Sequence, residues 1–319
     1  MKRFIICAAA AIVALASCSK TQVVYNDAPE EIGFKAISGV MTKDPVLGQT
    51  FPGGQPITVT AYNNANKESY FTETVFAKDN VSKNWEAATP EYYPTTGSLD
   101  FVAYTDDATN GVVSVTLTDN GTHTYTLADN SSVQHDFMVS NYVVDKGKTD
   151  PAAAVGIAFS HALALIEVNV ACTGADVTVN SVTLTGTKQA GQVTVTYTDA
   201  DNAVADVAPS VGAWFPSGDA ESLIEDTPQN LTAGGVAVKF ADFLVVPESE
   251  TDKTLVVNYT LNNNTFNHEI ELDAYQNATT WAFGTKYIFN VTIGLQEITF
   301  NPTVAGTGWT PANAGNPTI

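Results

Sequence analysis

Few residues of this chain have the types and spacing that catalysis requires. The four histidines, His123, His135, His161 and His268, are scattered, and no two cysteines stand at metal-ligand spacing. No G-x-S-x-G elbow, P-loop or dinucleotide fingerprint occurs. Adjacent acids such as Asp106-Asp107 would point to opposite faces of a strand, so they cannot face each other across a glycosidic bond. We therefore expect no enzyme, no metal site and no cofactor.

Covalent chemistry is expected at Cys18. Lys2 and Arg3 precede an apolar run from Phe4 to Leu15, which is the pattern of a secretory signal. Because Cys18 directly follows Leu-Ala-Ser, the site resembles the bacterial lipobox, in which the cysteine thiol is lipidated and becomes the first mature residue. Residues 1–17 are thus predicted to be a lipoprotein signal peptide, and Cys18 is predicted to hold the protein to a membrane through lipid. A plain signal with an incidental cysteine is the alternative.

The charge excludes one class of partner. The chain has 34 acidic residues against 14 Lys and Arg, a formal net charge of −20. Removal of the signal leaves 12 lysines and no arginine. Nucleic acids and anionic membrane surfaces are bound mainly through Lys and Arg, so neither is expected as a partner. The acidity favours solubility and repulsion between unassembled copies.

Beyond the signal, apolar and polar residues alternate as they do in β-strands. Ile32, Phe34 and Ala36 share one parity, and Ile37 with Val40 extends this first segment past a bend near Gly39. The Asn120-Gly121 pair between two β-rich runs predicts a tight hairpin whose two central residues have positive φ. Further strands are expected at residues 57–61, 99–103, 112–118, 122–127, 137–139, 157–170, 177–184, 192–198, 236–246, 254–261, 266–272 and 287–295.

Two of these strands contain a change of parity. Within 157–170 the inward residues shift by one position, and a second shift lies between Leu295 and Ile298. A β-bulge explains such a shift, with a helix over 162–166 as the competitor for the first. The tail from Asn301 is rich in Gly and Pro and is expected to be irregular.

The chain is long enough for two β-sandwiches. A polar run from Asp145 to Pro151 is the best boundary between them. We therefore expect a lipidated tether and first strand over 18–43, an N-terminal sandwich over 44–150 and a C-terminal sandwich over 151–319. Cys172, in an apolar strand, is expected to be a buried small hydrophobe rather than a reactive thiol.

Taken together, the motifs resemble those of the fimbrillins of Bacteroidales type V pili, over nearly the full chain. The matching pieces are the lipobox at Cys18; Ile32-Gly33-Phe34-Lys35-Ala36 followed by Thr42-Lys43; Glu91-Tyr92-Tyr93-Pro94 leading to Leu99-Asp100-Phe101-Val102-Ala103-Tyr104; Phe137-Met138; the run from Ile157 to Ala164; Trp214-Phe215-Pro216; and the run from Tyr287 to Ile293 with Glu297-Ile298-Thr299-Phe300.

The resemblance implies an all-β fold of two transthyretin-like (Greek-key) β-sandwich domains in tandem. It also implies a lipoprotein precursor that is carried to the outer membrane and ends on the cell surface in a fimbria. Other pilin subunits, of the same or a related chain, are the implied partners. A host or bacterial surface ligand is left unidentified by the sequence.

In this family a trypsin-like protease cuts after a basic residue beyond the first strand, and a strand of another subunit fills the vacated position. On this chain the removable strand would be Ile32–Val40, and the cut would follow Lys43, before Asp44, because no arginine is available. The family donor is C-terminal, which corresponds here to the region with Ile298, Phe300 and Val304. An uncleaved anchor subunit or a tip subunit is left open.

A different class of function competes with this one. Aromatic residues beside prolines could form stacking platforms of a surface glycan-binding lipoprotein with β-sandwich domains, although packing under a loop is their commoner use. The candidate residues are Trp85, Tyr92, Tyr93, Trp214, Trp281 and Trp309.

Overall fold

Strands make up nearly all the regular structure of the chain. The computed structural model describes residues 29–38, 55–79, 81–82, 84–105, 113–132, 134–148, 153–198, 200, 205–274, 280–295 and 298–307. The strands are β1 (Phe34–Ser38), β2 (Ile57–Asn63), β3 (Ser69–Lys78), β4 (Trp85–Ala87), β5 (Leu99–Thr105), β6 (Val113–Asp119), β7 (Thr122–Leu127), β8 (Met138–Ser140), β9 (Val143–Lys146), β10 (Val155–His161), β11 (Ala164–Cys172), β12 (Val177–Thr187), β13 (Ala190–Thr196), β14 (Ser210–Ser217), β15 (Glu221–Glu225), β16 (Gln229–Leu231), β17 (Val238–Val245), β18 (Thr254–Leu261), β19 (Asn264–Glu271), β20 (Thr285–Ile293) and β21 (Ile298–Thr307).

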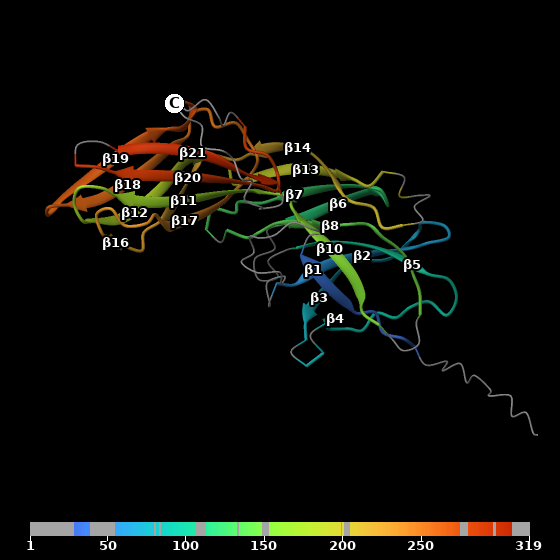
Figure 1. Cartoon of the computed structure of the whole chain (residues 1–319). Coiled ribbons are helices and arrows are strands. Elements are labelled where there is room, and N and C mark those ends of the chain that lie inside the picture. Colours follow the sequence, from blue (N-terminus) through green and yellow to red (C-terminus); the bar gives the residue numbers. More distant parts are fainter. Residues whose placement is uncertain are drawn as a thin grey trace, which may run out of the picture.

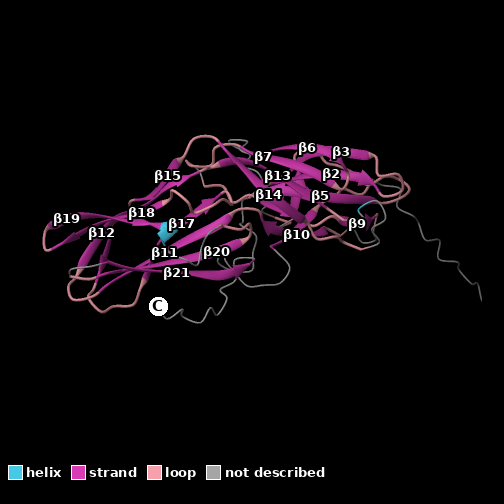
Figure 2. Cartoon of the chain, turned by 90° about the horizontal axis from the view of Figure 1, so that it is seen from above, coloured by secondary structure: helices cyan, strands magenta, loops and turns pink. Residues whose placement is uncertain are grey.

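The expectation of an all-β fold is confirmed. Helix in the described part is confined to 3-10 turns, such as Leu272–Ala274, and no helix there has the length and apolar character of a membrane span. Figure 2, coloured by secondary structure, shows this predominance of strands. The finer expectation of two transthyretin-like Greek-key sandwiches in tandem stays a prediction.

The strands form two lobes that lie end to end in an elongated molecule (Figure 1). We define the N-terminal lobe as β1 to β10 with β13 and β14, and the C-terminal lobe as β11, β12 and β15 to β21. Each lobe contains two sheets. The chain therefore leaves the N-terminal lobe after β10, returns for β13 and β14, and leaves again.

In the N-terminal lobe one sheet closes on itself. Its order is β2-β3-β4-β1-β10-β8-β5-β9, and β2 also pairs with β5, so seven strands form a ring with β9 attached to β5. The second sheet has the order β14-β13-β7-β6. Two of its joins are single residue pairs, Phe34 with Trp85 and Tyr104 with Val139, and its apolar interior is one core of the lobe. Another core lies between the ring and the second sheet.

The C-terminal lobe is built from two open sheets. One has the order β17-β11-β20-β21, with β11 and β20 parallel, and the other has the order β15-β12-β18-β19, with β16 on β12. Inward residues of both sheets form one apolar core, which contains Val168, Val182, Leu255 and Phe289. The alternating burial of β11 and β12 matches the period of two that their sequences show.

Strand pairing crosses the predicted boundary near residue 150. β10 pairs with β1 and β8, and β13 pairs with β7, so segments after Pro151 complete sheets of the N-terminal lobe. Strands of the range 44–150 and of the range 151–319 are therefore hydrogen-bonded to each other. That the two ranges are separate folding units stays a prediction.

The first parity change is a passage between lobes, so the expected β-bulge was wrong. Residues 157–170 form the end of β10 and most of β11, which belong to different sheets. Ala162 and Leu163 between them are fully buried. The Ala162 N–H donates to the Phe137 carbonyl (2.9 Å), and the Gly284 N–H donates to the Leu163 carbonyl (2.7 Å). The sequence changes parity because the chain changes which core it faces.

The second parity change is a hairpin. Ile293 at the end of β20 is paired with Ile298 at the start of β21, and β21 continues through Pro302 to Thr307. The expected irregular tail is thus wrong for residues 301–307. A proline fits there because β21 is the outermost strand of its sheet and needs hydrogen bonds on one side only.

The hairpin at Asn120-Gly121 forms as expected, but its turn differs. Thr122 on β7 is paired with Asp119 on β6, and a register shift lies between Leu117 and Asp119. Neither Asn120 nor Gly121 has a positive φ. The extra residue in β6 supplies the twist that two left-handed residues were expected to supply.

Candidate functional site

The segment from Glu30 to Ser38 lies between two other parts of the N-terminal lobe. β1 pairs in parallel with β10 along its whole length. On its other side it pairs with β4 at Phe34 alone. Just before β1, the Ile32 N–H donates to the Glu91 carbonyl (2.7 Å) and the Tyr93 N–H donates to the Glu30 carbonyl (3.0 Å). We call this position, between β10 and the segment from Glu91 to β4, the β1 slot.

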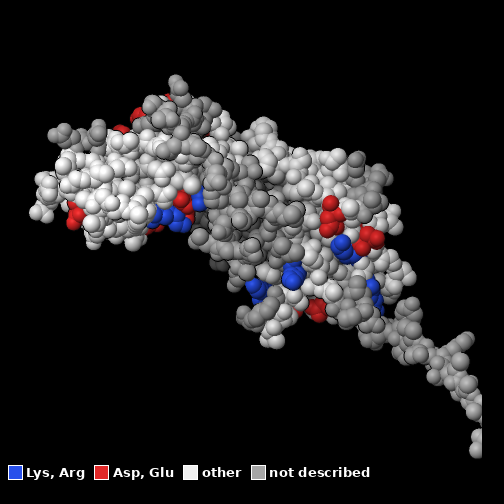
Figure 3. Space-filling view, viewed as in Figure 1, with Lys and Arg blue, Asp and Glu red and all other residues white. Residues whose placement is uncertain are grey.

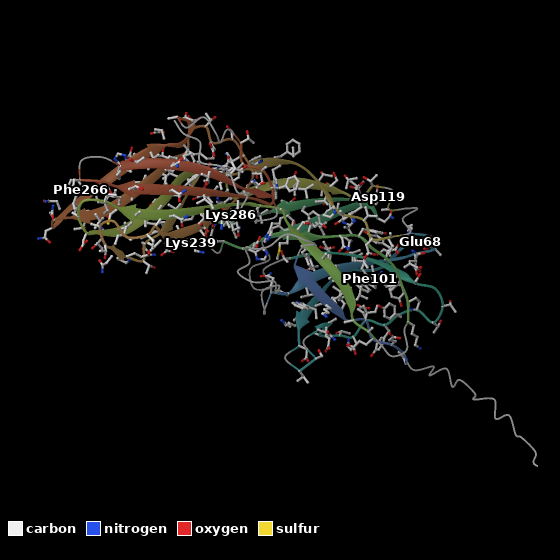
Figure 4. All side chains as sticks on the ribbon, in the orientation of Figure 1. Glu68, Phe101, Asp119, Lys239, Phe266 and Lys286 are labelled. Atoms are coloured by element: carbon white, nitrogen blue, oxygen red, sulfur yellow. The ribbon has the colours of Figure 1, made fainter. Side chains whose placement is uncertain are left out.

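Two side chains of this segment are completely buried in the slot. Ile32 and Phe34 are both 0% exposed, whereas Lys35 is exposed. The Phe34 ring meets Phe76 and Phe101 edge to face, with centroids 4.8 and 5.1 Å apart. Burial of one such side chain stabilises by about 1.5–3 kcal/mol. Phe101, labelled in Figure 4, belongs to β5, a strand of the ring, and its side chain is part of the core inside that ring.

The backbone of the segment bonds to β10 at alternate residues. The Val155 N–H donates to the Gly33 carbonyl (2.8 Å). In a parallel ladder, the residues that bond to one neighbour alternate along the strand. Gly33, Lys35 and Ile37 therefore bond to β10, and the backbone groups of Phe34 and Ala36 are directed to the opposite side.

A buried tyrosine borders the entry to the slot. Tyr93 is 7% exposed and Glu30 is 8% exposed. Burial, with the charge of Glu30 as the second cause, raises the pKa of Tyr93 to about 12. The phenol of Tyr93 is therefore neutral at physiological pH.

The structure describes part of the predicted removable strand. Ile32 and Phe34 are placed in the slot as given above, and the backbones of Ala36 and Ile37 pair with Ile157 and Ala158. Val40, Lys43, Asp44 and Cys18 lie outside the described residues. Cleavage after Lys43 and lipid attachment at Cys18 therefore stay predictions from the sequence.

The candidate donor region is an edge strand of the C-terminal lobe. Phe300 is 5% exposed, and its ring meets Phe289 edge to face at 5.2 Å. Ile298 packs partly buried against the core of that lobe, and Val304 is 37% exposed. Because β21 pairs with β20 alone, it is held from one side.

The single cysteine after the signal and two of the histidines noted in the sequence are buried or paired within the protein. Cys172 is 1% exposed, as expected, and burial raises the pKa of its thiol. His161 Nδ1 is 2.9 Å from Asp136, and His123 is fully buried with its pKa lowered to about 4 by that burial. No group of metal-ligating side chains occurs within the described ranges.

Three of the candidate stacking platforms are buried. The indole N–H groups of Trp85, Trp214 and Trp281 donate to Gln55, Ala162 and Glu250. Tyr93 is buried as well, whereas Tyr92 is 42% exposed, and Trp309 lies outside the described residues. Burial in the hydrophobic cores therefore accounts for Trp85, Tyr93, Trp214 and Trp281.

Two buried charged groups were missed by the sequence reasoning. Asp100 is 0% exposed and accepts from Lys67 Nζ (2.7 Å), Asn64 (2.8 Å) and the Asp145 N–H (2.9 Å). An acid between Leu99 and Phe101, in a strand that is otherwise apolar, was the available signal.

The second group surrounds Trp281. Glu250 is 1% exposed and accepts from the indole N–H at 2.5 Å. Burial raises the pKa of Glu250 to about 7, against the opposing effects of Trp281 and Lys253. Lys253 is 4% exposed and pairs with Glu248 at 3.1 Å. The polar run Glu248–Lys253 reads as a surface turn, so no local signal showed its burial.

One largely buried and one exposed ion pair are found on the C-terminal lobe. Lys286 pairs with Glu167 at 2.6 Å, and the more exposed Lys239 pairs with Asp242 at 2.6 Å. Figure 3 shows blue and red side chains side by side in the region where Figure 4 labels Lys239 and Lys286. The exposed pair, Lys239 with Asp242, contributes about 0–1 kcal/mol.

Comparison with known proteins gives a family and a set of similar folds. A family model described as fimbrillin-like matches residues 42–306. A fimbrial protein from Bacteroides vulgatus is 14% identical with a TM-score of 0.54, over 88% of this chain and 100% of that one. A candidate cell adhesion protein from Bacteroides uniformis is 18% identical with a TM-score of 0.52, over 87% and 99%. No curated protein matches the chain.

Proposed function

Since this chain belongs to the fimbrillin-like family, we propose that it is a structural or adhesive subunit of a cell-surface pilus. In this proposal it is exported as an outer membrane lipoprotein precursor through Cys18. A protease cuts after Lys43, the strand Ile32–Val40 leaves, and a strand of another subunit takes its place. The burial of Ile32 and Phe34 in the β1 slot is the observation that carries the proposal.

Loss of β1 would leave the slot both unpaired and uncovered. The backbone of β10 would lose its partner on one side, and the rings of Phe76 and Phe101 would lose Phe34. Unpaired backbone groups beside an exposed apolar core favour addition of a new strand. Main-chain bonds would supply affinity, and apolar side chains would supply selectivity.

The donor region repeats the spacing of the strand that it would replace. Ile298-Thr299-Phe300 has the same apolar pair, two residues apart, as Ile32-Gly33-Phe34. In this register Pro302 takes the position of Ala36, whose N–H is directed away from β10. The missing N–H of proline therefore costs no bond to β10, and Val304 takes the position of Ser38.

Processing is tested on the full chain by treatment with a lysine-specific protease and mass measurement of the new N-terminus. We expect a cut after Lys43, followed by ladders of oligomers, and neither in a Lys43→Ala variant. The control is Lys35→Ala, because Lys35 is exposed within β1. Ladders that persist in Lys43→Ala and vanish in Lys35→Ala would assign the cut to the other lysine.

Occupation of the slot is tested separately with a peptide. A synthetic peptide of residues 297–307 is added to cleaved chains from which the first strand has been removed, and binding is followed by native mass spectrometry. We expect one peptide per chain, and no binding when Ile298 and Phe300 of the peptide are both replaced by serine. Equal binding of both peptides would contradict selection by the two buried side chains.

Lipid attachment at Cys18 has its own test. Cells that express the chain are fed radioactive palmitate, and we expect label in the full chain and none in Cys18→Ser. Label that is unchanged in the variant would remove the lipoprotein part of the proposal while leaving strand exchange untouched.

A further inference from the structure

β19 is an open sheet edge at the end of the C-terminal lobe. It is the last strand of the order β15-β12-β18-β19, and no described strand pairs with its outer side. Seven of its eight residues are exposed, and only Ile270 is buried. Phe266, labelled in Figure 4, marks this end of the molecule, far from the β1 slot.

The other described edges carry features that hinder pairing. β14 contains Pro216, and β21 contains Pro302. β6 and β15 meet their neighbours with a register shift, and β17 carries Lys239 next to a shift. β9 and β16 are only 4 and 3 residues long. β19 has no proline, no lysine and an unbroken register with β18. Edges of this kind accept further strands.

The turn before β19 determines which backbone groups face outward. Asn262 and Asn263 have φ of 50° and 62°, and they connect Leu261 to its partner Asn264. In such a two-residue turn the flanking pair is hydrogen-bonded, and bonding then alternates along the strands. The N–H and C=O groups of Thr265, Asn267, Glu269 and Glu271 therefore face the open side.

We propose that this edge binds the same edge of a second copy of the chain, antiparallel and centred on His268. The two C-terminal lobes then share one continuous sheet around a two-fold axis. This contact does not depend on strand exchange, because it uses neither the β1 slot nor β21. It would join chains side by side.

Side-chain complementarity is the reason for choosing a second copy. In this register Phe266 lies opposite Ile270 of the second copy, so the 43% exposed ring gains an apolar neighbour. Glu269 lies opposite Asn267, and Glu271 lies opposite Thr265, so no two acids are directly opposed. The side-chain amide of Asn258 donates to Asn267 Oδ1 at 2.6 Å, which leaves the side-chain N–H groups of Asn267 to donate to the opposite Glu269.

The backbone part of the contact is tested by Glu269→Pro. Proline removes an outward N–H without removing a bond to β18, and Glu269→Ala removes the same side chain while keeping that N–H. Every chain carries Cys18→Ser and lacks the signal, residues 1–17, so that neither lipid nor the apolar run from Phe4 to Leu15 can drive association. Association is measured by sedimentation equilibrium at protein concentrations up to about 1 mM, which detects dimers with dissociation constants up to about that concentration. We expect dimers with Glu269→Ala and at least about tenfold weaker association with Glu269→Pro.

The register is tested by two charge variants at Asn267, which lose the bond to Asn258 equally. Asn267→Lys places an ammonium opposite Glu269 of the second copy and should strengthen the dimer. Asn267→Glu places two acids opposite each other and should weaken it, with the difference between the variants shrinking at high salt. Both remain informative even if Glu269→Pro fails to fold.

Three results would overturn the proposal. They are a monomer throughout the concentration range, equal association of Glu269→Pro and Glu269→Ala with both folded, and equal association of the two Asn267 variants. The last result would indicate that some other surface joins the copies.

Discussion

Replacement of Phe34 by alanine tests how the first strand is held. Phe34 is 0% exposed and meets Phe76 and Phe101 edge to face at 4.8 and 5.1 Å. Its backbone contributes a single pairing with β4, at Trp85. If burial rather than hydrogen bonding retains β1 in the slot, loss of this one ring should release the strand once the chain is cut.

The expected magnitude follows from the burial. A fully buried Phe→Ala change costs about 3–5 kcal/mol, which includes the transfer of the ring and the cavity that remains. This corresponds to an increase of about 10²- to 4 × 10³-fold in the dissociation constant of the cut segment. Lys35→Ala is the matched control, because Lys35 is the next residue of the same strand and is exposed. An exposed change should alter the constant by no more than about twofold.

The assay follows release of the cut segment directly. Residues 41–44 are replaced by a recognition sequence for a protease that cuts nowhere else, and a dye is attached at Cys18. The protein begins at Cys18, without the signal that contains Cys7, and Cys172 is 1% exposed, so the dye should react with Cys18 alone. After cleavage, the loss of dye from the protein is measured by fluorescence anisotropy. Thermal unfolding before cleavage confirms that each variant is folded. Equal release in Phe34→Ala and Lys35→Ala would refute the reasoning.

Three further predictions concern other buried groups. Lys67→Met should lower the free energy of unfolding by about 3 kcal/mol, measured with denaturant, because it leaves the buried Asp100 without its cation. Lys239→Met, at an exposed ion pair, is the control and should cost less than about 1 kcal/mol. Equal costs for the two variants would contradict this prediction. Burial raises the pKa of Glu250 from 4.5 to about 7 in the folded state, so the folded protein is disfavoured as pH rises above 4.5 and the penalty is complete above 7. Glu250→Gln should therefore gain about 3 kcal/mol over the original chain at pH 8 and little at pH 4, and a pH-independent difference would exclude this titration. In Cys18→Ser protein that lacks residues 1–17, and so lacks Cys7, Cys172 should react with a thiol reagent only at the rate of unfolding, because it is buried and burial raises its pKa. Rapid reaction of the folded protein would show that the strand opens.

Local pattern predicted most strands of this fold. The alternation in 254–261 and the Asn-Gly pair at 120–121 each identified an element, because a strand with one buried face alternates whatever its partner is. The same pattern carried no information about which sheet a strand joins. The change of parity near Ala162 therefore suggested a bulge, while the cause is a passage from one core to another.

The candidate site was predictable only in part, for the same reason. The apolar pair Ile32 and Phe34 indicated a strand that needs a partner, but its partner β10 is more than 100 residues away. Asp100 and Glu250 lie in networks whose members are distant in the chain, at Lys67 and Trp281. Such pairs are determined by tertiary packing, and the sequence near each acid does not specify them.

The two sides of β1 are bound unequally, and this bears on what can replace it. Any extended segment could form the ladder with β10, because main-chain bonds are the same for every sequence. The positions of Ile32 and Phe34 are different, because both side chains are 0% exposed. A polar residue there would be buried without a partner, which costs about 1–3 kcal/mol or more. Selection of the incoming strand should therefore act at these two positions, and a segment with large apolar residues two positions apart should compete, whichever subunit it comes from.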